Sequence, residues 1–297
     1  NRLGDAFLAA GGVADALTCY QRSLDVVQGL CRQDPQNATW QHDLSVSYVK
    51  IGDVLHGEGR DGAAADAYRR SLEIRQRLSV EGAQPVERFL RDVASAHTRL
   101  GNVLLGSRHS AAALEEYRAA VEITKDVVAR DPENVGWRRD LAVCYFRLGT
   151  ALEAVGTPDE ALHSYHESLA VGEGLRALDP GNRQWASDVA TGYNQVGKVL
   201  FEQGRLVEVV GANRKALAVM QELSASDPSD VRWRRELIAC HNNLAMLHRG
   251  LGDEEACQRH VEACWELLES LAPEQISSDR SLLLLRDALT TERRGRG

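Results

Sequence analysis

Residues 131–152 read DPENVGWRRDLAVCYFRLGTAL, and 48 residues later residues 179–200 read DPGNRQWASDVATGYNQVGKVL. Both stretches place a Trp twelve residues before a Gly and an Asp nine residues before it. The same register runs along the chain, and its repeat position, always preceded by Leu, Ile or Val, holds Gly4, Gly52, Gly101, Gly149, Gly197 and Ala245. A period kept in phase over this length indicates a repeat array. We call this position the repeat glycine.

A second pattern occupies the other half of each unit. A Tyr stands sixteen residues after the repeat glycine and four after an Ala, at Tyr20, Tyr68, Tyr117 and Tyr165. Small and large apolar residues follow it at helical spacings, which puts them on one face of a helix. Glycines inside each unit and Asp-Pro pairs between units stop these helices, and the following Asn or Asp can cap the next one. Each unit therefore predicts two helices of about 18–21 residues.

The predicted fold is all-α, a single array of six helix-pair units. The units span about 1–34, 35–84, 85–131, 132–179, 180–227 and 228–271, and the first helix is truncated at Asn1. We expect a C-terminal capping helix within 272–293 that covers the last unit, and a disordered tail at 294–297. In the fifth unit Val209 and Asn213 replace the Ala and the Tyr, so we expect weaker packing there.

Composition and charge exclude some classes of function. The 297 residues are 43% hydrophobic and 26% charged, with a net charge of −8. A negative chain disfavours binding driven by nucleic-acid phosphates, and no apolar run reaches the length of a membrane span. None of the six cysteines forms a CxxC pair, which predicts reduced thiols in a cytoplasmic protein. Because the chain begins at Asn1, we expect it to be a piece of a longer protein.

The sequence predicts no active site, metal site or cofactor. Cys144, between aromatic and basic neighbours, could suggest a reactive thiolate. Its register position elsewhere holds only small residues, at Ser47, Ala96, Gly192 and Cys240, which indicates a helix-packing position. His163 and His166 stand three residues apart on one predicted helix, but no third ligand is predicted nearby.

The residues also carry a family resemblance. The pattern Tyr145-x-x-Leu148-Gly149-x-x-Leu152, followed by Ala161-x-x-x-Tyr165-x-x-Ser168, resembles the tetratricopeptide repeat. The units here are longer, at 48 residues against about 34 in the family. Such long-helix arrays are similar to those of bacterial multidomain signalling proteins. The resemblance implies a right-handed superhelical solenoid in which the first helix of each unit lines a concave groove.

The groove residues that this resemblance implies vary from unit to unit, unlike the core positions. We predict a peptide-binding groove formed by Lys50, Asp53, Arg99, Asn102, Phe146, Arg147, Asn194, Gln195, Lys198, Asn242 and Asn243. Asn can bond both backbone N–H and C=O groups, and Arg can fork a carboxylate. The segments Tyr193-Asn-Gln-Val and His241-Asn-Asn-Leu-Ala are similar to kinesin light chain repeats, whose groove asparagines hold a peptide backbone. The carboxylate clamp of other family members is not matched by Thr98/Asn102 or by Phe146/Thr150.

Two alternatives stay open. The basic row could instead pair internally with Asp5, Asp53 and Glu153. At the level of function, we expect a non-enzymatic protein–protein interaction scaffold that binds an extended, acidic or mixed segment. It would be a cytoplasmic sensor or docking module of a larger bacterial signalling or defence system. The alternative is a helical-repeat binder of RNA or single-stranded nucleic acid, which would need aromatics such as Phe146 and Phe201 beside the basic row.

Overall fold

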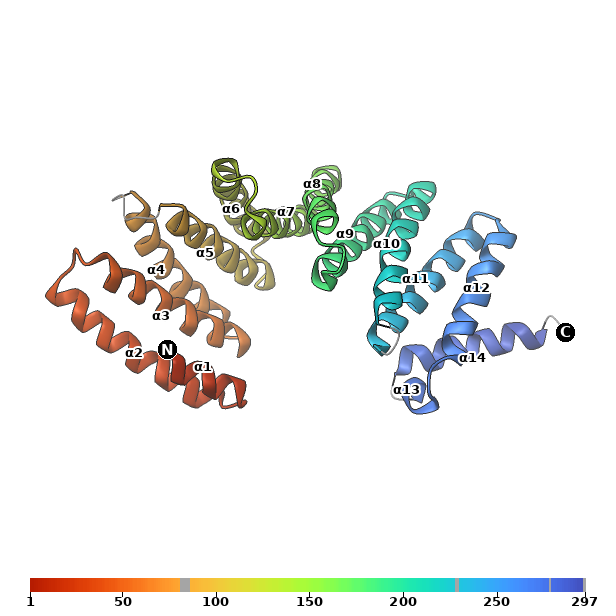
Figure 1. Cartoon of the computed structure of the whole chain (residues 1–297), viewed down its shortest axis with the longest axis horizontal. Coiled ribbons are helices and arrows are strands. Elements are labelled where there is room, and N and C mark those ends of the chain that lie inside the picture. The colour runs from red at the N-terminus through yellow and green to blue at the C-terminus, as the bar shows by residue number, and fades with distance from the viewer. Residues whose placement is uncertain (81–85, 228–229, 278, 296–297) are drawn as a thin grey trace. The chain divides into compact units, whose positions relative to one another are not determined.

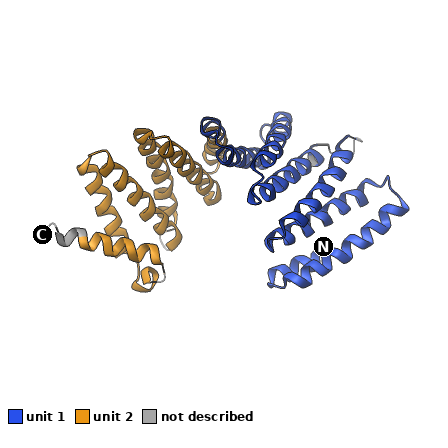
Figure 2. Cartoon of the chain, turned by 180° about the vertical axis from the view of Figure 1, so that it is seen from behind, with its two compact units in different colours: residues 1–164 blue, residues 165–297 orange. Residues whose placement is uncertain are grey.

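The computed structural model describes residues 1–80, 86–227, 230–277 and 279–295, and over these residues it is helical, with no strand. The predicted unit boundary near residue 84 lies outside the described residues. The chain divides into two compact units, residues 1–164 and 165–297 (Figure 2).

Unit 1 is a series of helices in which each packs against its neighbours along the chain (Figure 1). The helices are α1 (Arg2–Ala9), α2 (Val13–Gln33), α3 (Ala38–Gly57), α4 (Asp61–Val80), α5 (Val86–Gly106), α6 (Ser110–Arg130) and α7 (Val135–Val155), followed by the start of α8 (Pro158–Leu178). Helices α5 and α7 also touch directly, so the first helices of consecutive repeats lie side by side.

Unit 2 continues the same arrangement. After the end of α8 come α9 (Arg183–Glu202), α10 (Leu206–Ser226), α11 (Val231–Gly250), α12 (Glu254–Glu269), α13 (Pro273–Ser277) and α14 (Arg280–Gly295). Neighbours from α9 to α12 pack pairwise, and α14 packs on α12 and α13. Leu282 and Leu289 of α14 are buried in one cluster with Ile238, Cys264 and Leu268. Helix α14 runs to Gly295, and residues 296–297 of the predicted tail lie outside the described residues. The fold is therefore an all-α solenoid of helix pairs.

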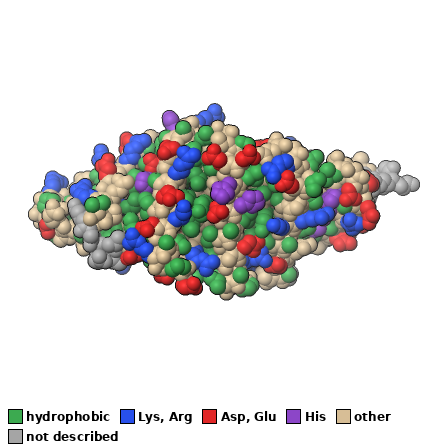
Figure 3. Space-filling model, turned by 90° about the horizontal axis from the view of Figure 1, so that it is seen from above, with side chains coloured by type: hydrophobic (Ala, Val, Ile, Leu, Met, Phe, Trp, Pro, Cys, Tyr) green, Lys and Arg blue, Asp and Glu red, His purple; other side chains and the backbone are tan. Residues whose placement is uncertain are grey.

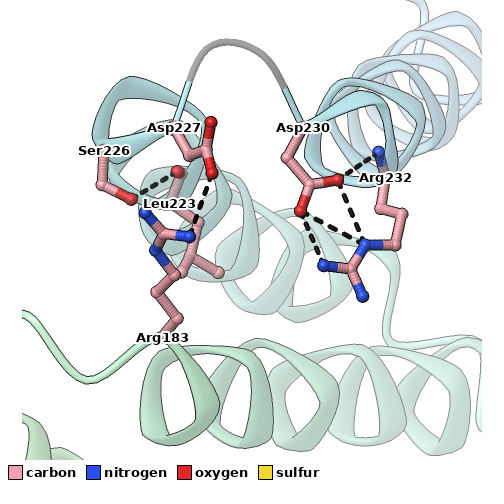
Figure 4. Close-up of polar contacts among 6 residues, drawn as sticks. All are labelled: Arg183, Leu223, Ser226, Asp227, Asp230 and Arg232. Atoms are coloured by element: carbon pink, nitrogen blue, oxygen red, sulfur yellow. Dashed lines mark hydrogen bonds and ion pairs between the residues drawn. The ribbon is translucent and has the colours of Figure 1, made fainter.

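The links between repeats hold the helix starts as the sequence predicts. The side chains of Asn134 and Asn182 each accept a hydrogen bond of 3.2 Å from a backbone N–H in the first turn of the next helix. Asp230 accepts bonds from both the backbone N–H and the guanidinium of Arg232 (Figure 4). At the other end of this link, Asp227 accepts a bond of 3.0 Å from Arg183 of α9. These contacts stabilise the orphan N–H groups of the first turn and tie the link to the preceding repeat.

The repeat glycine is required by the tyrosine that packs on it. A Cβ added at Gly52 would lie 2.6 Å from Cε1 of Tyr68, and one at Gly101 would lie 2.8 Å from Cε1 of Tyr117. Both rings are buried, with relative exposures of 2% and 0%. The ring thus fills the space between the two helices of a repeat, and only a residue without a side chain allows this approach.

Candidate partner-binding surfaces

In unit 1 the hydroxyl of each tyrosine that packs on a repeat glycine, at Tyr20, Tyr68 and Tyr117, donates to the residue directly after that glycine. Tyr20 donates to Oδ1 of Asp5 at 2.7 Å, and the Nζ of Lys50 in the next repeat donates to the same oxygen at 2.7 Å. The bond from Lys50, then that from Tyr20, holds the pKa of Asp5 below its ordinary value. A tyrosine, an acid and a cation from the following repeat therefore form one set of contacts, which we call a rung.

The second rung repeats these contacts. Tyr68 donates to Oδ1 of Asp53 at 2.7 Å, and Arg99 donates to the same oxygen. Burial of the ring and the bond to Asp53 raise the pKa of Tyr68. The internal pairing that the sequence left open is thus present for Lys50 and Arg99.

The third rung differs. Tyr117 donates to Oδ1 of Asn102 at 2.7 Å, so a neutral amide stands where the first two rungs have a carboxylate. The cation of this rung is Arg147, which is exposed and has no ion pair with any residue that the structure describes. Burial of the ring raises the pKa of Tyr117 to about 12, and the charge of Arg147 acts in the opposite direction.

A second set of contacts between repeats involves the acidic residues that stand nine positions before the repeat glycine. His42 of α3 lies 3.2 Å from Asp92 of α5, and Arg91 of α5 donates to Asp140 of α7. A pocket of about 460 Å³ between α5 and α7 is lined by Arg91, Asp92, Asp140 and the predicted residues Arg99 and Asn102. The available sequence signal was the acid that stands nine residues before the repeat glycine, a position that holds Asp92 and Asp140 here.

In unit 2 a pocket of about 580 Å³ lies between α9, α10 and α11, and we call it the α9–α11 pocket. Three predicted groove residues line it: Asn194, Lys198 and Asn243. It also contains two apolar side chains that are largely exposed, Phe201 at 59% and Met246 at 64%. The structure therefore gathers amide, cationic and apolar side chains on one hollow.

The α9–α11 pocket lies where unit 1 places a tyrosine. Gly197 and Asn213 both line it, and they correspond to the repeat glycine and its tyrosine. The amide of Asn213 reaches the glycine, since a Cβ added at Gly197 would lie 2.8 Å from Oδ1 of Asn213. An amide is shorter than a phenol ring, so the hollow stays open. A pocket borders this position, but α9 and α10 otherwise pack closely, and Val209 and Ala212 are buried between them.

The other predicted residues of unit 2 lie close by. A further pocket of about 720 Å³ is lined by Asn194, Gln184, Trp233 and Glu236, so Asn194 and Glu236 border both hollows. The amide nitrogen of Asn242 lies 3.9 Å from the sulfur of Met246. Gln195 is half-buried on α9. In unit 1, Phe146 is half-buried on α7 beside Arg147.

The thiol of Cys144 lies in a helix-packing position. It is 4% exposed, and its Sγ lies 3.6 Å from Oγ1 of Thr124 and 3.7 Å from Oγ1 of Thr98. Burial raises its pKa, so the nucleophilic thiolate is disfavoured at neutral pH. Within the described part of the chain, no three His, Cys, Asp or Glu side chains are placed to hold a metal ion.

Three histidines gather in unit 2, a cluster that the sequence did not predict. Nδ1 of His241 lies 3.0 Å from Nδ1 of His260, and the ring of His248 stacks on His260 with centroids 5.7 Å apart. Burial, followed by the charges of His241 and His248, lowers the pKa of His260 to about 4. Packing of α11 on α12 brings these residues together, and core periodicity alone does not reveal it.

Charge is mixed on the surface. Figure 3 shows basic and acidic side chains interspersed among hydrophobic ones. Such mixing gives no extended basic face of the kind that phosphate backbones require on the side shown. No helix in the described ranges combines the length and apolar character needed to cross a bilayer.

Comparisons with known proteins agree with this architecture. Residues 98–165 match a family model described as tetratricopeptide repeat. The crystal structure of BtubC (BKLC) from P. vanneervenii is similar, with 19% identity and a TM-score of 0.64 over 88% of this chain and 94% of that one. Nro1, a hypoxic regulator of sterol synthesis and nuclear import adaptor, has 11% identity and a TM-score of 0.63 over 93% and 89%.

A third similar structure is a Rap protein complexed with Competence and Sporulation Factor, with 13% identity and a TM-score of 0.50 over 92% of this chain and 74% of that one. No curated protein matches the sequence. At these identities the likeness concerns the fold. With its helix pairs, its repeat register and the family model that matches residues 98–165, the chain has the fold of a helical repeat protein of the tetratricopeptide type.

Proposed function

We propose that this chain is a non-enzymatic protein-interaction scaffold, and that the α9–α11 pocket binds an extended segment of a partner protein. The observation that carries the proposal is the hollow that Asn213 leaves open in unit 2, with exposed Phe201 and Met246 at its surface. Exposed apolar side chains grouped around a hollow favour a binding site, because single exposed apolar residues are normal but grouped ones are not.

The polar groups of the pocket suit a peptide backbone. Asn194 and Asn243 line the hollow from two different helices, α9 and α11. Each amide can donate and accept, which matches the alternating N–H and C=O groups of an extended chain. The apolar side chains between them would contact a side chain of that segment, and the flexible thioether of Met246 can adapt to its shape.

Likeness of fold supports an interaction role by analogy. The Rap protein is complexed with a factor, and Nro1 is an adaptor. We propose by the same analogy that this chain serves as a sensor or docking module within a larger bacterial signalling or defence system in the cytoplasm.

A random peptide library displayed on phage tests the proposal. The purified chain is expected to enrich extended peptides that contain an apolar residue. The affinity of these peptides for an Asn194→Ala/Asn243→Ala double variant should fall at least about tenfold, because each lost backbone hydrogen bond weakens binding. Gln221→Ala, which removes an exposed amide on α10, is the control and should bind as the original chain does.

Either of two results would contradict the proposal. The library could yield no enriched peptide, or the enriched peptides could bind the double variant and the original chain equally. Circular dichroism of each variant is the control that checks whether its helices are retained.

A further inference from the structure

We propose that the α9–α11 pocket receives an aromatic side chain of the partner segment, in the place where the repeats of unit 1 hold a ring of their own second helix. This inference rests on the proposed function, because it names the side chain that enters the same pocket. The proposed function requires only an apolar side chain, whereas the groups that line the pocket favour an aromatic ring over an aliphatic one.

Unit 1 shows how a ring is held at this position. The rings of Tyr68 and Tyr117 pack directly on Gly52 and Gly101, where an added Cβ would lie 2.6 and 2.8 Å from a ring carbon. Both rings are buried, and each hydroxyl lies 2.7 Å from an oxygen of the residue after the glycine. A ring at this position therefore spans the distance from the repeat glycine to the side chain that follows it.

In the repeat of Gly197 the second helix fills only the inner end of this space. The amide of Asn213 lies against the glycine, since Oδ1 would be 2.8 Å from a Cβ added at Gly197. Gly197, Asn213 and Lys198, the residue after the glycine, all line the pocket. Because an amide side chain is shorter than a phenol ring, the pocket includes the region that the outer half of the ring occupies in unit 1.

The walls of the pocket carry groups that interact with π systems. Phe201 and Met246 line it and are largely exposed. A second ring can stack or pack edge-to-face on a phenyl group, and a thioether sulfur makes favourable contacts with ring edges. Lys198 supplies a third such group, because an ammonium is attracted to the face of a ring. An aliphatic side chain of the same area gains none of these three interactions.

The pocket recognises the ring and not a phenol hydroxyl. In unit 1 the residue after the repeat glycine accepts the hydroxyl proton, at Asp5, Asp53 and Asn102. The corresponding residue here is Lys198, whose ammonium group has donors and no acceptor. We therefore expect phenylalanine to bind at least as well as tyrosine.

The ring belongs to a residue of a polypeptide rather than to a free aromatic molecule. The amides of Asn194 and Asn243 line the same pocket. Each can donate to and accept from the backbone of the residue that carries the ring, and a free aromatic molecule would leave these groups without that use.

The two methionines of the chain supply a reporter and an internal control. Met246 lines the α9–α11 pocket, whereas Met220 is buried and borders the neighbouring hollow. Isotope labelling of the methionine methyl groups gives one NMR signal for each, and Met246→Leu assigns them by removing one. The probe is the peptide acetyl-Gly-Gly-Phe-Gly-Gly-amide. In the comparison peptide, cyclohexylalanine replaces phenylalanine, so that a similar apolar area is presented without a π system.

We expect the phenylalanine peptide to shift the Met246 signal saturably, because a ring current changes the field at a nearby methyl group, and to leave the Met220 signal in place. The Kd of the cyclohexylalanine peptide, measured by competition, should be at least about fivefold higher. Equal Kd values for the two peptides would overturn the inference. So would a Met246 signal that stays in place up to the solubility limit of the phenylalanine peptide.

Two variants place the ring in the pocket. Phe201→Leu keeps an apolar side chain but removes the aromatic partner, so it should weaken the phenylalanine peptide about threefold or more and the cyclohexylalanine peptide by less than about twofold. Phe146→Leu, in unit 1, is the matched control and should leave both Kd values within about twofold. Asn213→Tyr should abolish the Met246 shift. If that variant does not fold, Phe201→Leu decides alone, and equal losses for both peptides in it would contradict the inference.

The two proposals fail in different ways. If displayed peptides depend on Asn194 and Asn243 but bind without an aromatic residue, the aromatic preference is wrong and the scaffold proposal stands. If the phenylalanine peptide behaves as expected but no displayed peptide is enriched, the pocket receives a ring and is not a site for an extended segment.

Discussion

The repeats of unit 1 and the α9–α10 repeat of unit 2 place different residues at one repeat position, and the surface next to that position differs. In unit 1 the position sixteen residues after the repeat glycine holds tyrosines, whose rings are buried and whose hydroxyls end on Asp5, Asp53 or Asn102. In the repeat of Gly197, which lies in unit 2, the same position holds Asn213, and a pocket of about 580 Å³ lies there. The comparison indicates that replacement of one interior ring in a solenoid can be accompanied by a surface hollow, with no change in the order of helices.

The largest expected effect is a difference in the unfolding free energy that is lost when Tyr117 and when Asn213 is replaced by Ala. Tyr117→Ala should cost about 3–5 kcal/mol of unfolding free energy, because it empties a fully buried site. Asn213→Ala should cost about 0.5 kcal/mol or less, since Asn213 is only partly buried. Urea denaturation followed by circular dichroism measures both. Similar losses would show that the two positions do not differ as described.

A second difference is sensitivity to pH, which we expect in unit 2 through His260. Burial and the charges of His241 and His248 lower its pKa in the folded state to about 4, whereas an unfolded histidine titrates near 6.5. The unfolded chain therefore binds the proton first as pH falls. The stabilisation is fully present above pH about 6.5 and is lost progressively toward pH about 4.

His260→Gln tests this difference. The original chain should lose roughly 1 kcal/mol between pH about 7 and about 5, less than the whole pKa shift would give because the ring is partly exposed and screened by solvent, and the variant should lose markedly less. His163→Gln, an exposed histidine in unit 1, is the control and should behave as the original chain does. Identical pH dependence in all three proteins would refute a role for the histidine cluster.

The smallest effect concerns the rungs of unit 1. Asp5→Asn should cost roughly 0.5 kcal/mol at neutral pH, a small value because the pair with Lys50 is partly exposed to solvent. The folded-state pKa of Asp5 is lowered, first by Lys50 and then by Tyr20. Its contribution is thus present above the ordinary carboxyl pKa of about 4 and disappears as pH falls through the lower folded value. Thermal melts of the original chain and of Asp5→Asn, at neutral pH and at a pH below the folded-state pKa of Asp5, measure this contribution. A difference between the two proteins that persists in acid would contradict the ion-pair explanation.

Much of the fold follows from the sequence, because helix pairs and their caps depend on local spacing. Asn134 and Asn182 cap their helices as their position before each Trp predicts. The rungs could not be assigned in the same way. The ion pair of Lys50 with Asp5 joins residues 45 apart, so it depends on how consecutive repeats stack. The sequence placed both residues near the groove but left open whether they pair.

The pocket had a sequence signal whose consequence was only partly predicted. Replacement of tyrosine by Asn213 indicated weaker packing, but it did not specify whether neighbouring side chains would fill the space that the ring occupies elsewhere. Phe201 and Met246 line the pocket and remain largely exposed there. The histidine cluster gave no such signal, because it depends on how α11 packs on α12.

The central claim is that the α9–α11 pocket binds a partner segment because Asn213 leaves it open. The most direct test is the affinity of display-selected peptides for an Asn213→Tyr variant, measured by isothermal titration calorimetry together with its melting temperature. The claim predicts at least about a tenfold loss of affinity with an unchanged or higher melting temperature, since the ring would fill the hollow as Tyr68 and Tyr117 do in unit 1. An Asn213→Tyr variant that is folded and binds these peptides with the original affinity would contradict it.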